Sequence, residues 1–463
     1  MEDAIKEVSE KDHSENASFI CVILSHGDEN KIYGIDDYTD LHKLTGFLKG
    51  TKCKSLIGKP KLFFIQACRG QKFDDGVPLR DCVDADPTPS PPKLPVEADF
   101  LYAYGTAKGY YAWRNEEKGS WFIQTLCEKL LELRNQELMH ILTSVNRKVA
   151  YEFESSQGQH KEIPCVTSLL TKLFYFPKTL PQQRIMADEK QLKNDQPSSL
   201  DSVDVAQITM EDRSVKASST VPGTEDDCVY KMDYGNVGRC VIINNKTFTS
   251  GLETRLGTDV DQAALQKTFE DLGYKVDVHN DLTKNQMKSV LKEVSEEDHS
   301  QNSSFVCVIL SHGTDDKIHG TDKSVKLDSL TEYFKGKECL SLFGKPKLFF
   351  LQACRGKKFD EGLDRDVLEA SPLPTRKKLP VEADFLYAYA TAPGHVAWRN
   401  HEKGSWFIQS LCEILPKHKH RELMHILIRV NRKVAFDYES SKTKQKEIPC
   451  ITCMLTKEFY FPK

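Results

Sequence analysis

The chain repeats itself over a long period. EVSEKDHSENASFICVILSHG at 7–27 recurs as EVSEEDHSQNSSFVCVILSHG at 293–313, and KLFFIQACRG at 61–70 recurs as KLFFLQACRG at 347–356. Later blocks, PVEADFLYAY and EKGSWFIQ among them, also occur twice in the same order. A period of this length indicates a duplicated domain and not a solenoid of short repeats. We therefore expect two domains, which agrees with a length of 463 residues, too long for one compact core.

The two copies differ at their starts. Copy one is defined as residues 1–178 and copy two as residues 232–463. Because Met1 aligns with Met287, the first part of copy two has no counterpart in copy one. Residues 179–231 are rich in Gln, Ser, Asp and Lys and poor in aromatic residues, so we expect them to form a flexible linker.

The segment that only copy two carries has two recognisable parts. GRCVIINNKTF at 238–248 is typical of a strand. TDVDQAALQKTFEDLGY at 258–274 has apolar residues near helical spacing, and Thr258 or Asp259 is a suitable N-cap. A strand followed by a helix is therefore predicted here, and both are absent from copy one.

Apolar runs alternate with helical patterns in each copy. In copy two the runs FVCVIL, KLFFLQ and DFLYAYAT are separated by stretches such as WFIQSLCEIL and ELMHILIRVNRKVAF. Near-continuous apolar strands separated by helices predict an α/β fold, with a mostly parallel central sheet flanked by helices. Ligands of such sheets bind beyond the carboxyl ends of the strands.

Composition excludes several kinds of partner. A net charge of −4, with 64 basic and 68 acidic residues, provides no basic surface for nucleic acid or an anionic membrane. The start lacks a secretory signal, and no apolar run is long enough to span a bilayer. We therefore expect a cytoplasmic protein whose 14 scattered cysteines are reduced thiols. Cys450 and Cys453 would face opposite sides of a strand, so no metal and no cofactor are expected.

Polar residues follow two of the predicted strands. His312 and Gly313 come after FVCVIL, and Cys354 comes after KLFFLQA. A cysteine attacks a carbonyl as thiolate and needs a nearby base, which His312 would supply. The N–H groups of Gly313 and Cys354 would hold the developing oxyanion. Taken singly, a cysteine that ends an apolar strand is more often core, and His-Gly is more often a turn. The equivalent residues of copy one are Cys68, His26 and Gly27.

Several motifs in order resemble those of the apoptotic effector caspases. They are HG, QACRG, PVEADFLYAY, AWRN, GSWF and the IPC before the terminal FYFPK. The resemblance covers 232–463, and it covers 1–178 as a copy that lacks its beginning. It implies the caspase-like three-layer sandwich and a thiol protease, a cysteine endopeptidase made as a zymogen that cleaves after aspartate during apoptosis.

The resemblance also implies a substrate pocket. Arg255, Gln352 and Arg399 would bind the substrate's aspartate, and two guanidinium groups in a closed pocket would reject substrates without a carboxylate. Without the motifs, the arginines would be read as surface ion-pair residues and the nearby aromatics as core. Residues for the upstream part of the substrate would be Trp398, Asn400 and Trp406, and copy one retains Gln66 and Arg114.

Activation and assembly follow from the same resemblance. Cleavage is expected after Asp84, Asp204 and Asp366, so the large subunit of copy two would end at about 366 and its small subunit would begin at about 375. The partners implied are protein substrates with aspartate before the scissile bond. Effector caspases pair through their small subunits, which allows a homodimer or an intrachain pseudo-dimer.

Two departures leave a second function open. Copy one has no match to Arg255, and copy two has Val396 where the family and copy one have tyrosine. The loop before IPC is short in both copies, which leaves upstream specificity open. The first hypothesis is a protease that uses copy two. The alternative is a non-catalytic or regulatory caspase partner, a reading that copy one favours.

Overall fold

The computed structural model describes most of both copies. The described residues are 1–28, 30–69, 80–81, 94–115, 119–153, 155, 160–177, 228–356, 379–440 and 445–462. None of the helices within these ranges is long and apolar enough to cross a membrane.

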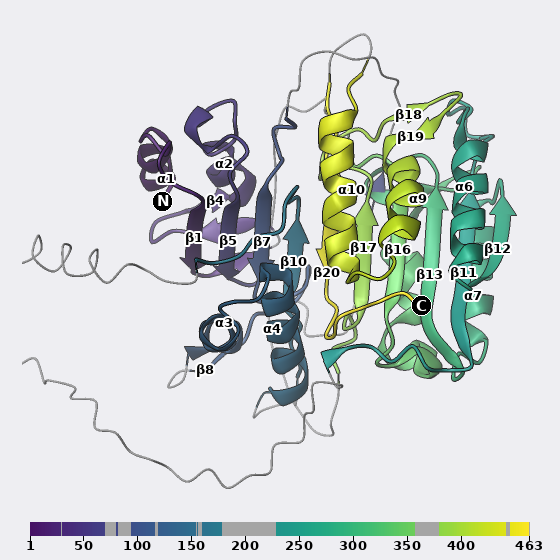
Figure 1. Ribbon diagram of the computed structural model, residues 1–463, viewed down its shortest axis with the longest axis horizontal. Helices are drawn as coiled ribbons and strands as arrows, with labels where there is room; N and C mark the ends of the chain where they lie inside the picture. The colour runs from purple at the N-terminus through teal and green to yellow at the C-terminus, as the bar shows by residue number, and fades with distance from the viewer. Residues whose placement is uncertain are drawn as a thin grey trace, which may run out of the picture.

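One sheet of ten strands runs through both copies (Figure 1). The strands of copy one are parallel to one another up to β10 (Cys165–Ser168), which is antiparallel to its neighbours. The strands of copy two are parallel to one another from β17 (Phe385–Tyr389) to the opposite edge of the sheet. The mostly parallel α/β sheet predicted from the apolar runs is confirmed. In spatial order the strands are β1 (Phe19–Leu24), β5 (Lys61–Gln66), β7 (Phe100–Tyr104), β10 (Cys165–Ser168), β20 (Cys450–Cys453), β17 (Phe385–Tyr389), β16 (Lys347–Gln352), β13 (Asn302–Leu310), β11 (Asn236–Asn244) and β12 (Lys275–Asn280).

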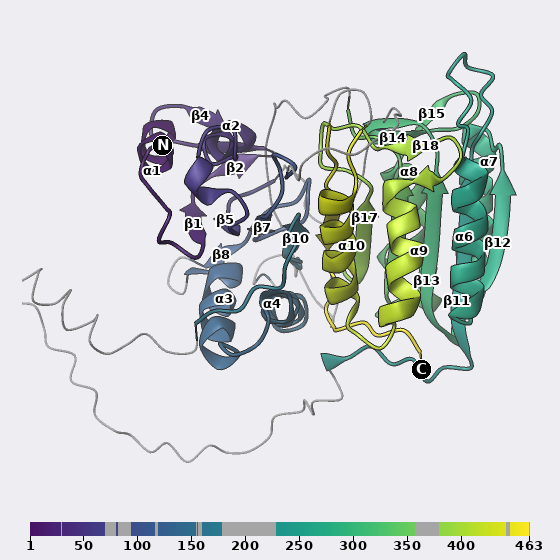
Figure 2. The same ribbon diagram turned by 45° about the horizontal axis from the view of Figure 1, so that its top comes forward.

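Helices cover the sheet on its two faces. In Figure 2, α6 (Thr258–Asp271), α9 (Trp406–His418) and α10 (Leu423–Asp437) lie in front of the strands of copy two. Alternate residues of β5 enter different clusters, since Leu62 and Phe64 pack with α3 and α4 while Phe63 and Ile65 pack with α2. The helices are α1 (Glu2–Ser9), α2 (Leu41–Gly46), α3 (Trp121–Glu132) and α4 (Leu138–Glu152) in copy one, and α6 (Thr258–Asp271), α7 (Lys284–Glu296), α8 (Asp328–Thr331), α9 (Trp406–His418) and α10 (Leu423–Asp437) in copy two.

Short strands and turns lie at the ends of the main sheet. Copy one contributes β6 (Arg80–Asp81), whose backbone pairs with β14 (Gly313–His319) of copy two. The other short elements are β2 (Gly27–Asp28), β3 (Lys31–Tyr33), β4 (Tyr38–Asp40), β8 (Arg114–Asn115), β9 (Gly119–Ser120), β15 (Ser324–Lys326), β18 (Arg399–Asn400), β19 (Gly404–Ser405) and the 3₁₀ turns η1 (Lys54–Leu56), η3 (Glu332–Phe334) and η4 (Gly336–Leu342).

The copies join where β10 runs antiparallel to β20. Thr167 pairs with Thr452, which occupies the same position in the second copy. Around this pair the contacts are reciprocal: the Asn146 amide donates to the carbonyl of Leu455 at 3.2 Å, and its counterpart Asn431 donates to the carbonyl of Leu170 at 3.3 Å. The sheet therefore has a local pseudo-two-fold axis at the junction of the two copies, with four strands on one side and six on the other.

The upstream segment of copy two differs slightly from expectation. The predicted strand is β11, and the predicted helix is α6, but the N-cap of α6 is Gly257 and neither Thr258 nor Asp259. Gly257 has a φ of +84°, and a Cβ there would lie 2.2 Å from the carbonyl oxygen of Asn400. Glycine is therefore required by close backbone approach as well as by conformation.

The C-terminal end of the expected linker is packed against copy two. The Tyr230 ring is buried, and its hydroxyl donates to Asp384 at 2.6 Å. The end of the predicted linker segment, at residues 228–231, therefore packs with copy two.

Candidate active site

Two neighbouring strand ends position the sequence-predicted nucleophile and base. β13 and β16 are parallel, with Leu310 opposite Gln352. Just beyond them, the Ser311 N–H donates to the carbonyl of Gln352 at 3.3 Å. His312 and Cys354 therefore lie at the same end of the sheet, as expected for residues that follow two paired parallel strands.

The Cys354 thiol is held against the backbone of a facing loop. Its side chain is buried, and Sγ accepts the Ala397 N–H at 3.0 Å. The next residue binds the same loop, because the Arg355 N–H donates to the carbonyl of His395 at 2.8 Å. The facing loop therefore shields the sulfur in this conformation.

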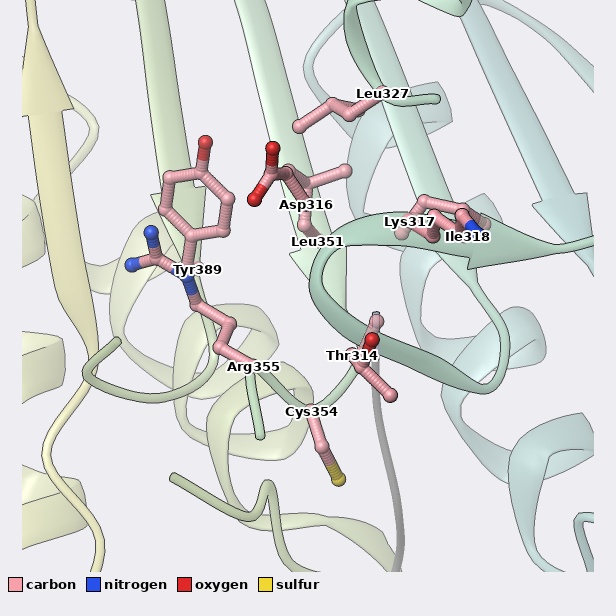
Figure 3. A pocket seen from close by; sticks show the side chains of 10 residues that line it. Thr314, Asp316, Lys317, Ile318, Leu327, Leu351, Cys354, Arg355 and Tyr389 are labelled. Carbon is pink, nitrogen blue, oxygen red and sulfur yellow. The ribbon is translucent and has the colours of Figure 1, made fainter. Parts of the chain in front are cut away.

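A small pocket adjoins Cys354 on the side away from its sulfur. Figure 3 shows Sγ directed away from the other lining side chains. The guanidinium of Arg355 lies 3.9 Å above the ring of Tyr389, a cation–π contact that closes one wall. The lining residues are Thr314, Asp316, Lys317, Ile318, Leu327, Leu351, Ala353, Cys354, Arg355 and Tyr389.

His312 is buried in a defined tautomeric arrangement. Its Nε2 lies 2.7 Å from the carbonyl oxygen of Glu253, and its ring centroid lies 4.7 Å from that of Phe248. Because a carbonyl oxygen only accepts, Nε2 carries the proton, and Nδ1 is the basic nitrogen of the neutral ring. Gly313 follows directly as the first residue of β14.

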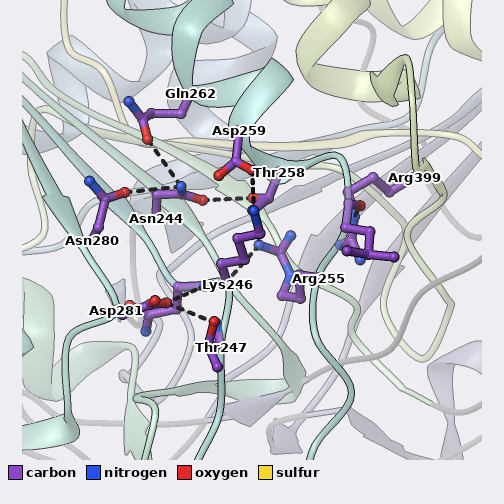
Figure 4. A network of polar contacts seen from close by, with 12 residues as sticks. Asn244, Lys246, Thr247, Arg255, Thr258, Asp259, Gln262, Asn280, Asp281 and Arg399 are labelled. Atoms are coloured by element: carbon purple, nitrogen blue, oxygen red, sulfur yellow. Dashed lines mark hydrogen bonds and ion pairs between the residues drawn. The ribbon is translucent and has the colours of Figure 1, made fainter.

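Arg255 and Arg399 meet at the turn that leads into α6 (Figure 4). Arg255 is fully buried, and its Nη1 donates to the carbonyl of Asn245 at 3.1 Å and to the Thr258 hydroxyl at 2.8 Å. Arg399 is also buried, and its Nε donates to the carbonyl of Leu256 at 2.8 Å. Since Leu256 follows Arg255 in the chain, the two predicted substrate-binding arginines surround one turn.

Asp261 ties this turn to the rest of copy two, and the sequence analysis missed it. Its carboxylate accepts the Ser405 N–H at 2.9 Å and the Gln409 amide at 2.7 Å. Burial raises the pKa of Asp261 above its usual value, and the hydrogen bonds and the charge of Arg255 offset only part of this increase. An acidic residue in the first turn of the predicted helix was the available signal.

The indoles predicted to contact substrate are packed in the interior. Trp398 and Trp406 are both buried and stack with their ring centroids 5.3 Å apart. Asn400 shapes a turn instead, because its side-chain oxygen accepts the N–H groups of Glu402 and Lys403 at 2.8 Å each. In this conformation, Trp398 and Trp406 are therefore core residues, which was the alternative interpretation of the sequence. Gln352, the last residue of β16, is buried as well.

A buried carboxyl supports the tryptophan loop in both copies. Glu447 accepts the N–H of Trp398, and Glu162 of copy one accepts the N–H of Trp113. Burial raises the pKa of Glu447 and of Glu162 well above the usual value. The repeated EIPC block contains both residues and is the signal that could have identified them.

Copy one has the strand-end residues but a different arginine environment. Arg114 is exposed, whereas its counterpart Arg399 is buried. Gly27 packs closely on Cys68, since a Cβ at Gly27 would lie 2.9 Å from the Cys68 carbonyl oxygen. The remaining predicted residues of copy one are His26, which is exposed, and Gln66, which is buried.

Some predictions fall outside what can be located. Asp84, Asp204 and Asp366, the expected cleavage positions, lie outside the described residues. Val396, which replaces the family's tyrosine, is buried. Within the described ranges, no group of three or more His, Cys, Asp or Glu side chains is arranged to hold a metal ion.

Comparison with known proteins identifies the family. The model of the caspase domain matches residues 1–175 and again 237–460. Caspase-3 of Bos taurus is 55% identical over 240 residues, which cover 50% of this chain and 87% of that protein. Caspase-3 of Oryctolagus cuniculus is 50% identical over 270 residues, and Caspase-3 of Mus musculus is 51% identical over 270 residues; each match covers 56% of this chain and 97% of the relative. The chain therefore belongs to the caspase family of cysteine peptidases, as an executioner-type, apoptotic member that carries the caspase domain twice.

Proposed function

We propose that copy two is a cysteine endopeptidase that cleaves peptide bonds after aspartate. The observation that supports this most strongly is the pair of buried arginines, Arg255 and Arg399, at one turn of the same copy that carries Cys354 and His312. A substrate carboxylate would balance the two positive charges and accept from both guanidinium groups. A neutral side chain would form neither charge-assisted hydrogen bond, which accounts for the proposed selectivity.

The proposed reaction uses residues of copy two alone. His312 takes the proton of the Cys354 thiol. The thiolate then attacks the backbone carbonyl carbon of the substrate's aspartate residue. The N–H groups of Gly313 and Cys354 stabilise the oxyanion of the tetrahedral intermediate. His312 then protonates the leaving amine, and the C–N bond breaks to give a thioester. Water, deprotonated by His312, hydrolyses that thioester and restores the thiol.

The uncut chain is proposed to be the zymogen. One contact supports a latent state: the Ala397 N–H donates to the sulfur of Cys354 and holds it against the facing loop. Cleavage after Asp366 would free the chain that follows Cys354 and let the facing loop rearrange. Cleavage after Asp84 and Asp204 would release the corresponding segments of copy one and the linker.

Copy one is proposed to act as a non-catalytic partner within an intrachain pseudo-dimer. The pairing of β10 with β20 and the reciprocal contacts of Asn146 and Asn431 support this arrangement. The exposed Arg114 supports the loss of aspartate recognition in copy one. We propose protein substrates and a cytoplasmic location, where thiols stay reduced; no disulfide joins the cysteines that the structure describes.

The test compares the wild type with Cys354→Ala and Cys68→Ala after cleavage of the chain, on a reporter peptide that ends in aspartate. We expect Cys354→Ala to abolish cleavage and Cys68→Ala to leave it unchanged. Loss with Cys68→Ala alone would reverse the assignment of the two copies. If no precleaved sample cleaved the reporter, the non-catalytic partner would be the correct function.

A further inference from the structure

The outer strand of copy one exposes one apolar face. Ile20, Val22 and Leu24, alternate residues of β1, are 45%, 54% and 64% exposed. β1 is the first strand in the order of the ten-stranded sheet. Their counterparts on β13 are Val306, Val308 and Leu310, and all three are fully buried. The same side chains therefore have opposite environments in the two copies.

Copy two shows what covers this face. β11 pairs in parallel with β13, placing Cys240 opposite Val306 and Ile242 opposite Val308. Helix α6 then packs over these strands, with Leu265 and Phe269 fully buried. Its Thr268 lies beside the thiol of Cys412 on α9. The cover is thus a strand that extends the sheet, followed by an amphipathic helix.

Copy one retains the surface that receives such a cover. Phe64 stands where Phe350 does in copy two, and the Phe350 ring lies 5.9 Å from the ring of Phe269. Cys127 on α3 stands where Cys412 does on α9, but Cys127 is exposed. We name this surface, formed by β1 and the exposed side of α3, the β1–α3 face.

The two outer strands of the sheet differ in charge. β12, at the opposite edge, carries Lys275, Asp277 and His279, and Asp277 pairs with Arg239 at 2.7 Å. β1 reads FICVIL and contains no charged residue. Charged side chains are a common means of keeping an edge strand from pairing with other chains, so β1 lacks this protection.

We propose that the β1–α3 face is a docking site for a strand–helix unit of another polypeptide with the chemistry of residues 236–271. The strand of the unit adds parallel to β1, and the apolar side of its helix covers Ile20, Val22 and Leu24. A separate polypeptide is favoured over a second copy of this chain. The β11–α6 unit that the structure describes is already packed in copy two. If a second copy of the chain lent this unit to the β1–α3 face, its own copy two would lose the unit and expose an equivalent face.

The experiment uses the full chain and a synthetic peptide of residues 232–274. Alkylation of Cys127 is followed by peptide mapping with reagent in excess over both polypeptides, and the exposed Cys228 is the internal control. At about 100 μM peptide, a site with a Kd of about 10 μM slows the reaction of Cys127 about tenfold. The reaction of Cys228 is expected to stay constant.

Matched variants separate docking from nonspecific association. A Phe269→Asp peptide is expected to give no protection, whereas a Lys267→Gln peptide, changed on the exposed side of α6, protects as the wild type does. In the full chain, Val22→Asp is expected to abolish protection. Leu340→Asp, at a residue that is 72% exposed in copy two, leaves it intact.

Three results would overturn the proposal. The first is an unchanged Cys127 rate at saturating wild-type peptide. The second is protection that persists in Val22→Asp. The third is a dimer of the chain in which Cys127 reacts as slowly as Cys412 in the absence of peptide. A second copy of the chain would then be the occupant.

Discussion

Thr167 of copy one and Thr452 of copy two face each other where the two copies join in the ten-stranded sheet, and they are the same position of the two copies. On either side of this pair the register is reciprocal, since Val166 lies opposite Cys453 and Ser168 lies opposite Ile451. Such a self-complementary contact is the geometry of a two-fold interface between subunits. Here it lies within one chain.

The reciprocal amide contacts give the first prediction. Asn146→Ala and Asn431→Ala each remove one buried hydrogen bond to the other copy, so each is expected to lower the free energy of unfolding by about 1 kcal/mol. The double variant should lose about the sum, because the two bonds share no partner. Urea unfolding measures this, with the exposed Asn236→Ala as control. A double variant no less stable than Asn236→Ala would contradict the interface.

The arginine pair gives the second prediction. Arg399→Lys keeps the charge but removes the Nε donor that bonds to Leu256. We expect kcat/KM for an aspartate reporter to fall about 10- to 100-fold, the equivalent of losing one charged hydrogen bond. Arg114→Lys, the same change in copy one, should leave kcat/KM unchanged. Equal losses from both changes would mean that copy one also binds substrate.

Gly257 and Gly251 form a pair of test sites with similar backbone conformations. Their φ angles are +84° and +81°, but a Cβ at Gly257 would lie 2.2 Å from the Asn400 oxygen, whereas no atom lies within 4 Å of a Cβ at Gly251. Gly251→Ala should cost about 1–2 kcal/mol of stability from backbone strain alone. Gly257→Ala should cost more and raise KM, since Asn400 adjoins Arg399. Urea midpoints and reporter kinetics measure both, and equal costs would exclude the close approach.

A buried glutamate predicts a pH dependence. Burial raises the pKa of Glu422 from 4.5 to about 7. The folded chain therefore binds this proton more tightly than the unfolded chain does, and the free energy of unfolding falls as pH rises through this window. Glu422→Gln should remove this decrease of the free energy of unfolding between pH 4.5 and about 7, a decrease of at most about 3 kcal/mol. Urea unfolding at several pH values measures it.

The control for the pH experiment is the exposed Glu402→Gln, which should keep the wild-type slope. Glu422 accepts the N–H of Met424 at 2.6 Å at the start of α10, and glutamine can accept the same bond, so the helix cap is preserved. A wild-type slope in Glu422→Gln would show that another group is responsible.

Much of the fold follows from patterns that are local in sequence. The apolar runs that become β13 and β16 are fully buried parallel strands, so His312 and Cys354 had to leave the sheet close together. The helical spacing also located α6 and α10 within a few residues. Burial and periodicity decide these features, and both can be read from consecutive residues.

The remaining features depend on contacts between distant segments. The bond from Ala397 to the Cys354 sulfur joins two loops, and no local pattern specifies it. Trp398 and Trp406 could be surface or core by composition, and their stacking decides for core. The N-cap of α6 went to Gly257 because a carbonyl 143 positions away in sequence (400 − 257) approaches it, which outweighs the side-chain preference for Thr258.

The strand pairing that joins the two copies also sets a stoichiometry. Because β10 and β20 belong to one polypeptide, the unlike halves are synthesised in equal number and meet at the high effective concentration that a covalent tether imposes. Among the residues that the structure describes, the buried arginines are Arg255 and Arg399 of copy two. Under the proposed function, each assembled unit would therefore offer one catalytic centre, where a symmetric dimer offers two. Cooperativity between equal centres is then impossible within such a unit, and its response to substrate should be hyperbolic.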